Sequence, residues 1–223
     1  MDFSPDQVRR ALLALAAFVV SVSVHEFGHA LVADRLGDRL PRQQGRLTLS
    51  PLAHIDLIGT IVMPLVAALL PGGFPLIAWG KPVQTNPRNY TERLPRKVGR
   101  MLVSLAGPAM NLVLALVTSI VFVLLGRAGK LPPAVAEALI RYVIALNLIL
   151  MFFNLIPLPP LDGAAVLAGL LPDSAQVVPR TLEKYGSLLF FILFLSGALG
   201  FVMAPAYRVI GAWAGALQRL VPA

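Results

Sequence analysis

The stretch ALLALAAFVVSVSVHEFGHALVA, residues 11–33, decides how this chain folds, because apolar residues surround three ionisable side chains in it. Extended to residues 8–33, it is long enough as a helix to cross the roughly 30 Å hydrocarbon core of a bilayer. Ionisable groups are costly inside a membrane and usually mark a function. The stretch therefore predicts a membrane helix in which His25, Glu26 and His29 form a polar site.

The composition also indicates a membrane protein. Of the 223 residues 57% are hydrophobic and 13% are charged, whereas soluble domains have about 25% charged residues. Cysteine is absent, which excludes disulfides and cysteine-ligated metal sites, so any metal must be held by His, Asp or Glu. The net charge is +8, but the basic residues lie in short loops between apolar runs, where they set membrane orientation. We therefore expect no nucleic-acid partner.

Four apolar segments are long enough to cross the bilayer, namely 8–33, 101–125, 142–161 and 185–207. A further segment, 57–79, is uncharged but contains three prolines and several glycines, and basic loops flank it on both sides. The positive-inside rule places both loops in the cytosol, so we expect this segment to enter and return, with a fifth crossing as the alternative.

The predicted fold is an all-α polytopic membrane protein, in which residues 1–223 form a single membrane-embedded domain. It is a helical bundle of about four to five transmembrane helices, plus a re-entrant or broken segment with short β-like strands near the polar site. The loop charges place His25 and His29 near the cytosolic end of the first helix, and segment 142–161 returns to the same depth. We expect an integral multi-pass protein of the cell membrane, with its site toward the cytosol.

The pattern from His25 to His29 is H-E-x-x-H. On a helix the two histidines lie one turn apart on the same face, where both imidazoles can bind one zinc ion. Glu26 is placed to act as general base on water that the metal activates. The structural alternative is a buried histidine pair bonded to backbone carbonyls, with Glu26 as its counter-charge.

Zinc also needs a third protein ligand. The candidate is Asp162, in the stretch NLIPLPPLDG from Asn154 to Gly163, where prolines open the helix and glycine allows close approach. Asp162 could also begin the next helix as its N-cap. His54 is a rival third ligand because zinc favours histidine, although a role beside the site is the preferred interpretation.

The stretch Leu105-Ala106-Gly107-Pro108 with Asn111 is interpreted as a packing element of the second long helix. Small residues let membrane helices approach closely, and an asparagine can form a hydrogen bond between helices. We expect no catalytic role for it.

These motifs, in this order, resemble the site-2 protease family of intramembrane zinc metalloproteases, in its small form without appended soluble domains. The resemblance covers most of the chain. It implies one bound Zn²⁺ ion, and roles for individual residues follow from it. The metal ligands would be His25, His29 and Asp162, the catalytic residues would be Glu26 and Asn154, and His54 would be an accessory residue near the site.

In this interpretation Glu26 activates the water, and Asn154 holds the substrate backbone or the developing oxyanion. The expected substrate is a transmembrane protein or peptide whose helix unwinds, pairs with the segment Phe74–Val83 and is hydrolysed in or near the membrane. Two other functions stay open, a membrane divalent-metal transporter and a catalytically inactive scaffold. A transporter needs polar groups distributed across the bilayer, whereas here they gather at one level.

Overall fold

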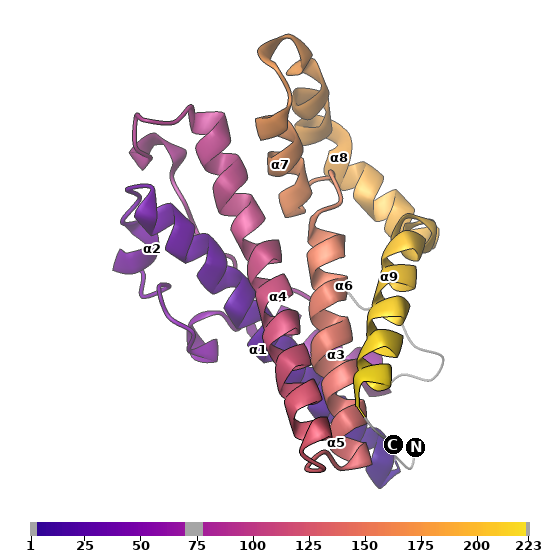
Figure 1. Ribbon diagram of the computed structural model, residues 1–223. Coiled ribbons are helices and arrows are strands. Elements are labelled where there is room, and N and C mark those ends of the chain that lie inside the picture. The colour runs from indigo at the N-terminus through magenta and orange to yellow at the C-terminus, as the bar shows by residue number, and fades with distance from the viewer. Residues whose placement is uncertain (1–3, 70–77, 222–223) are drawn as a thin grey trace.

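A computed structural model of the chain describes residues 4–69 and 78–221 (Figure 1). Its longer helices are α1 (Pro5–Arg35), α4 (Arg96–Arg127), α6 (Ala145–Asn154), α7 (Asp162–Leu170), α8 (Val177–Leu195) and α9 (Leu199–Leu220). Its shorter helical elements are α2 (Leu40–Gln43), η1 (Pro51–Ala53), η2 (Leu57–Val62), α3 (Met63–Leu69), η3 (Pro87–Asn89), α5 (Pro133–Ala138), η4 (Leu139–Ile144) and η5 (Asp173–Ala175).

Three helical stretches are long and apolar enough to cross a membrane, and a fourth is added if the bent pair α8 and α9 is one span. The three are α1, α4 and the continuous stretch Pro133–Asn154, which joins α5, η4 and α6. The predicted spans 8–33 and 101–125 fall within α1 and α4. The third stretch differs from the predicted span 142–161 at both ends. It begins at Pro133, and it ends at Asn154 because the prolines that follow cannot continue a helix.

The predicted span 185–207 is not one continuous helix, and its crossing of the membrane stays a prediction. The chain breaks between Leu195 and Leu199, and α8 and α9 are bent by 76° relative to each other. Gly197 lies at this break with a φ of 74°, the left-handed conformation that commonly ends a helix at glycine. An average of hydropathy over a whole span does not register one such residue.

The region 57–79 begins as the π-helix η2 and continues into α3, which ends at Leu69. Residues 70–77 lie outside the described part of the chain, so the choice between a re-entrant segment and a fifth crossing stays a prediction. The predicted short β-like strands are not found among residues 4–69 and 78–221. Instead, residues 78–86 form an irregular stretch whose backbone donates from Trp79 to Gly59 at 3.2 Å and from Lys81 to His54 at 2.8 Å.

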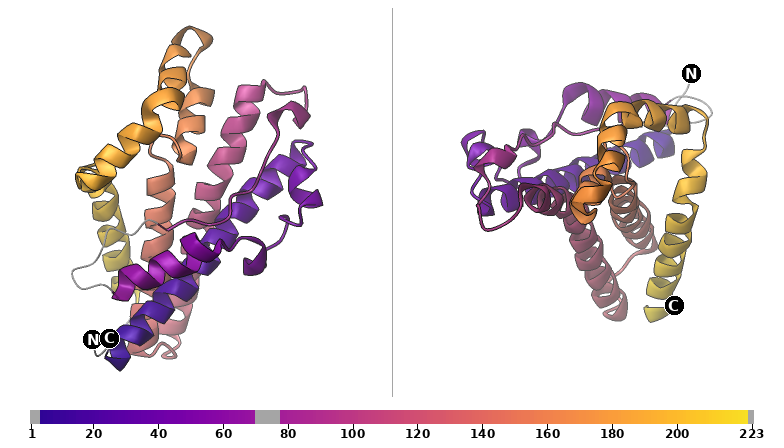
Figure 2. Two further views of the ribbon diagram at one scale, coloured as in Figure 1. Left: turned by 180° about the vertical axis from the view of Figure 1, so that it is seen from behind. Right: turned by 90° about the horizontal axis from the view of Figure 1, so that it is seen from above.

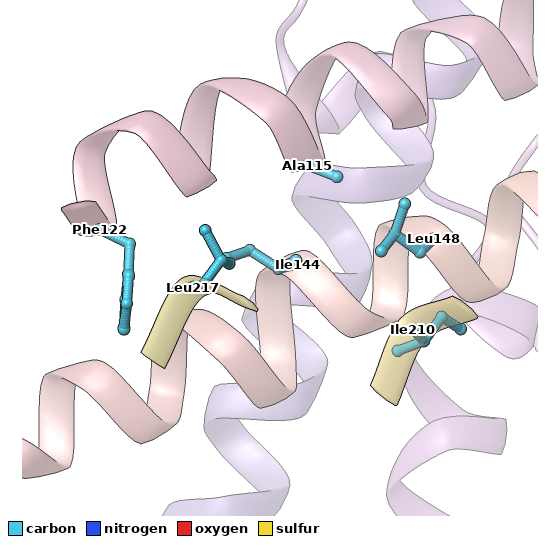
Figure 3. Packing of buried hydrophobic residues seen from close by; sticks show 6 residues of the cluster. All are labelled: Ala115, Phe122, Ile144, Leu148, Ile210 and Leu217. Atoms are coloured by element: carbon cyan, nitrogen blue, oxygen red, sulfur yellow. The ribbon is translucent and has the colours of Figure 1, made fainter. Parts of the chain in front are cut away.

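The long helices run back and forth, with the start of α1, the end of α9 and the connection from α4 to α5 at one end (Figures 1 and 2). The start of α4 and the connection between α7 and α8 lie at the other end (Figure 1). Figure 3 shows how α4, the η4–α6 stretch and α9 meet in an apolar core. The buried residues of this core are Ala115, Phe122, Ile144, Leu148, Ile210 and Leu217.

Helix α1 packs along α4, and a glycine allows the close approach. A Cβ atom on Gly28 would lie 2.6 Å from the carbonyl oxygen of Ala106 and 2.8 Å from Cγ of Met110. Because lipid tails are as apolar as leucine, membrane helices are held together by close contact and by polar groups between them. The packing role predicted for the Leu105–Asn111 stretch agrees with this contact.

Candidate metal centre

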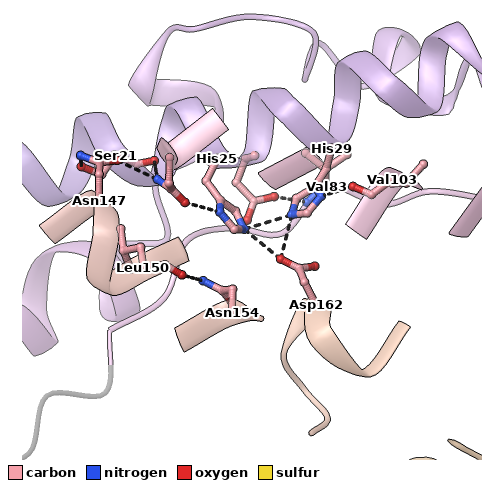
Figure 4. A network of polar contacts seen from close by, with 11 residues as sticks. Ser21, His25, His29, Val83, Val103, Asn147, Leu150, Asn154 and Asp162 are labelled. Carbon is pink, nitrogen blue, oxygen red and sulfur yellow. Dashed lines mark hydrogen bonds and ion pairs between the residues drawn. The ribbon is translucent and has the colours of Figure 1, made fainter. Parts of the chain in front are cut away.

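Two histidines and one aspartate meet where α1, α4 and α7 converge (Figure 4). His25 and His29 lie one turn apart on α1, and their Nε2 atoms are 3.0 Å apart. Oδ2 of Asp162 lies 3.2 Å from Nε2 of His25 and 3.3 Å from Nε2 of His29. Within the described residues, this is the group of three His, Cys, Asp or Glu side chains whose ligand atoms converge, all within 4.8 Å of one another. We call it the three-residue cluster.

Asp162 reaches the cluster because the chain turns sharply after α6. Helix α6 ends at Asn154, and α7 begins at Asp162. A Cβ atom on Gly163 would collide with the carbonyl oxygens of Leu155 and Ile156, so glycine is what lets the first turn of α7 fold back. Leu161 is the N-cap of α7, and Asp162 follows it in the first turn, so the capping role considered for Asp162 is wrong.

Each imidazole is also held on its far side. Nδ1 of His25 lies 2.6 Å from Oδ1 of Asn111, and Nδ1 of His29 lies 2.7 Å from the carbonyl oxygen of Val103. Both partners are acceptors, so each ring carries its proton on Nδ1 and donates it outward. Both Nε2 lone pairs therefore point into the cluster.

This arrangement fits a zinc ion. Two imidazole nitrogens and a carboxylate oxygen face one another at 3.0–3.3 Å, which is repulsive unless a proton or a metal cation lies among them. Nitrogen and oxygen ligands at about 2.0–2.1 Å from a tetrahedral metal are themselves about 3.3–3.4 Å apart. The side chains are close to that spacing.

Glu26 lies beside the cluster and is bound by a distant part of the chain. Its Oε2 accepts a hydrogen bond from the backbone N–H of Val83 at 2.8 Å. Val83 lies within the irregular stretch 78–86, whose backbone is bound to His54 and Gly59. The general base predicted from H-E-x-x-H is therefore held against the segment that was expected to contact substrate.

His54 lies away from the cluster. Its ring is fully buried, and Nε2 lies 2.9 Å from the carbonyl oxygen of Thr48. Among the described residues the third member beside His25 and His29 is Asp162, so the rival ligation by His54 is not what the structure shows. The backbone of His54 instead accepts from Lys81 and so supports the stretch that leads to Val83.

Asn154 is the last residue of α6 and lies on the same side of the cluster as Asp162 (Figure 4). Its Nδ2 donates to the carbonyl oxygen of Leu150 at 2.9 Å. A carboxamide has a second N–H, which this bond does not use. Its predicted contact with substrate stays a prediction.

Sequence reasoning missed what Gly107 and Asn111 do at the site. A Cβ atom on Gly107 would lie 2.6 Å from Nε2 of His25 and would also collide with Nε2 of His29, so α4 presses directly on both rings. Asn111 binds the ring of His25. The available signal was their spacing of four residues, which places a small and a polar residue on one face of a helix.

Comparisons with known proteins agree with this geometry. Residues 13–131 and 125–197 match the sequence profile of peptidase family M50. The chain is 38% identical over 191 residues to YwhC of Bacillus subtilis, which carries the name of a zinc metalloprotease; the match covers 84% of this chain and 82% of that protein.

Two mycobacterial proteins named Rip2, also under the name of zinc metalloprotease, are similar as well. The protein of Mycolicibacterium smegmatis is 34% identical over 190 residues, and that of Mycobacterium tuberculosis is 33% identical over 193 residues. Each match covers 84% of this chain and 68% of the relative. No solved structure matches the chain significantly. From the profile match and these relatives, the chain belongs to peptidase family M50, the site-2 protease family of zinc metalloproteases.

Proposed function

We propose that the protein is an intramembrane zinc endopeptidase that hydrolyses peptide bonds in or near transmembrane helices of other membrane proteins. The observation that carries the proposal is the position of His25, Glu26 and His29 on α1. This helix is apolar enough to span a membrane, and His25, Glu26 and His29 are all buried in it. Ionisable residues inside such a helix usually mark a function within the membrane, where a membrane-embedded substrate can reach them and a soluble substrate cannot.

His25, His29 and Asp162 would hold the metal through Nε2, Nε2 and Oδ2. When bound, zinc supplies a Lewis acid that makes water a nucleophile near neutral pH and polarises a carbonyl group. Side chains of this chain would supply the other catalytic groups. The protein would then be a single membrane domain that contains every group needed for hydrolysis.

Glu26 would take a proton from the attacking water on its carboxylate and pass it to the leaving amine. Its hydrogen bond from Val83 fixes Oε2 and leaves the other carboxylate oxygen to receive the proton. Asn154 would donate its second N–H to the substrate backbone or to the oxygen where negative charge develops. Both groups then act on the same peptide bond from residues far apart in the chain.

The substrate helix must unwind before cleavage, because a helix engages its carbonyl groups in its own hydrogen bonds. The irregular stretch beside Glu26 can receive the unwound chain. Trp79 and Lys81 use their backbone N–H groups toward Gly59 and His54. The backbone N–H of Gly80 and the carbonyl of Pro82 make no backbone hydrogen bond within the described residues, so they would be the groups that pair with the substrate.

Water needs a route to the site, and a cavity of about 350 Å³ supports one. Its lining includes Val103, whose carbonyl binds His29, and Ala165, three residues after Asp162. It also includes Tyr90 and Arg100, which belong to the basic region that follows segment 57–79. The basic loops on both sides of that segment support a cytosolic location for the site in the cell membrane.

The test is the variant Glu26→Gln in purified, membrane-reconstituted protein. We expect cleavage of a model transmembrane substrate to fall by about 10²–10⁴-fold, the usual contribution of a general base, while bound zinc stays at the wild-type level. Glu137→Gln is the matched control, since the side chain of Glu137 is 66% exposed and lies outside the site.

Two results would contradict the proposal. One is wild-type cleavage by Glu26→Gln, which would remove Glu26 from the mechanism. The other is zinc flux into proteoliposomes without any cleavage by the wild-type protein, which would assign the cluster to transport.

A further inference from the structure

We propose that Asn147 is a positioning residue for the metal: acting with Ser21 through Asn111, it fixes the ring of His25 in the form that binds zinc. The inference rests on the proposed function in one respect, because it takes His25 as a zinc ligand. It assigns a role to a residue of α6 that touches neither the metal ligands nor the substrate-facing stretch. It also explains why an amide is buried in an apolar helix.

The observation is a chain of hydrogen bonds that crosses three helices (Figure 4). Ser21 of α1, Asn111 of α4 and Asn147 of α6 all have 0% exposure. Nδ2 of Asn147 donates to Oγ of Ser21 at 2.8 Å, and Oδ1 of Asn147 accepts from Nδ2 of Asn111 at 2.8 Å. Oδ1 of Asn111 in turn accepts from Nδ1 of His25 at 2.6 Å.

The direction of this chain is set by backbone carbonyls, which can only accept. Oγ of Ser21 donates to the carbonyl of Ala17 at 2.7 Å, so it is left to accept from Asn147. Asn147 also donates to the carbonyl of Val143 at 2.9 Å. Its Nδ2 is thereby fixed, and its Oδ1 must face Asn111.

The same reasoning fixes Asn111. Its Nδ2 faces Oδ1 of Asn147 and also donates to the carbonyl of Ser21 at 3.2 Å. Its Oδ1 must therefore face His25, and His25 must carry its proton on Nδ1. The lone pair of Nε2 then points at the cluster.

A rotated Asn111 would have the opposite effect. Its N–H₂ group would face Nδ1 of His25, the ring would move its proton to Nε2, and Nε2 could no longer bind a metal. The ring of His29 needs no further residue to fix its proton on Nδ1, because its partner is the carbonyl oxygen of Val103, which can only accept a hydrogen bond. In the membrane interior no bulk water is present to correct a wrong amide orientation.

A purely structural role for Asn147 makes a different prediction. Interhelical hydrogen bonds stabilise membrane proteins, so their loss should lower thermal stability and leave the zinc affinity of the folded protein unchanged. A positioning role should lower the zinc affinity itself. Partners that orient a metal-binding histidine usually change metal affinity by about 10–100-fold.

The experiment measures zinc affinity by competition with a chelator, in folded, purified protein, for three variants. Asn147→Leu should lower the affinity by about 10–100-fold and alter the visible spectrum of the cobalt-substituted protein, which reports ligand geometry. Asn147→Asp should recover most of the affinity, because a buried, neutral carboxyl can accept from Asn111 and donate to Ser21. Ser119→Ala is the matched control: Ser119 is buried and bonds between helices, to Trp213, away from His25.

Wild-type zinc affinity in folded Asn147→Leu would overturn the inference. If that variant does not fold, Asn147→Ala decides, since it removes the same Oδ1 acceptor with a smaller side chain; unchanged affinity there would overturn the inference equally. These readouts do not depend on proteolysis. A Glu26→Gln protein that cleaves normally would end the proposed mechanism and leave this inference standing, whereas His25→Ala with normal zinc affinity would end both.

Discussion

Two parts of the molecule are built from apolar helices but differ in what they bury. Helices α1, α4 and α7 hold the three-residue cluster, and α1, α4 and α6 bury polar side chains against one another, among them Asn111 and Asn147. The second part, α8 and α9, is here called the arm. Large apolar side chains of the arm are exposed, with Leu195 at 77% and Phe201 at 86%.

Glycines of α1 and α4 differ in the same way from those of α9, whereas Gly186 on α8 is packed against Pro159. A Cβ atom on Gly28 or Gly107 would collide with neighbouring atoms, whereas Gly200, Gly211 and Gly215 of the arm have no other atoms within 4 Å of that position. Hydropathy therefore identifies helices that can enter a membrane, but small and buried polar residues identify the faces on which those helices meet. The arm presents an exposed apolar surface, and the other helices present a site.

The largest effect is expected from Gly107→Ala. The added methyl group would displace both imidazoles, and a misplacement of about 1 Å in a catalytic group can cost about 100-fold in rate. We expect at least that loss of cleavage, together with weaker zinc binding. The matched control is Gly211→Ala in the arm, where open space should leave zinc affinity and cleavage unchanged. Equal effects of the two substitutions would contradict the prediction, because they would mean that the close contacts of Gly107 do not matter for zinc binding or cleavage.

An intermediate effect is expected where the arm joins the other helices. Nε1 of Trp213 on α9 donates to Oγ of Ser119 on α4 at 3.1 Å. Trp213→Phe removes this donor, and we expect a loss of roughly 0.5–1 kcal/mol in stability, typical of hydrogen bonds between membrane helices. Zinc affinity should not change. A double-mutant cycle with Ser119→Ala measures the bond, and full additivity would mean that the two side chains do not interact.

The parts of the site that could be predicted from the sequence are those encoded by short-range spacing. His25 and His29 share a face because they are one helical turn apart, and that follows from helix geometry alone. The approach of Asp162 was inferred from its position after a proline-rich helix end and from the resemblance. The structure brings all three together within 4.8 Å.

The parts that could not be predicted depend on contacts between distant residues or on a single backbone angle. Asn111 meets His25 across 86 positions of sequence, and no local pattern specifies which side chain an interhelical amide will bind. The bend at Gly197 depends on a positive φ in an otherwise apolar run. The expectation of β-like strands overlooked two features of the stretch beside the site. Pro82 has no backbone N–H to donate to a neighbouring strand, and the N–H of Val83 donates to the carboxylate of Glu26 instead.

The smallest effect is expected at Tyr90, a buried polar residue of the part that holds the cluster. It is buried against Ala33 and Val103 in the part that holds the cluster, yet its hydroxyl makes no hydrogen bond of normal geometry within the described residues. Replacing an unpaired polar group by an apolar one of the same shape is nearly neutral, so Tyr90→Phe should change stability by less than about 0.5 kcal/mol at pH 7.

The pH dependence supplies the sharper readout. Burial raises the pKa of Tyr90 above its usual value near 10. In the unfolded chain this hydroxyl loses its proton at a lower pH than in the folded protein, so the unfolded state binds fewer protons in that range. Stability should therefore fall as the pH rises above about 10, and Tyr90→Phe should remove that part of the fall. Thermal unfolding at pH 8 and pH 11 measures the difference, and identical alkaline profiles for the two proteins would show that the hydroxyl is solvated, contrary to the packing around it.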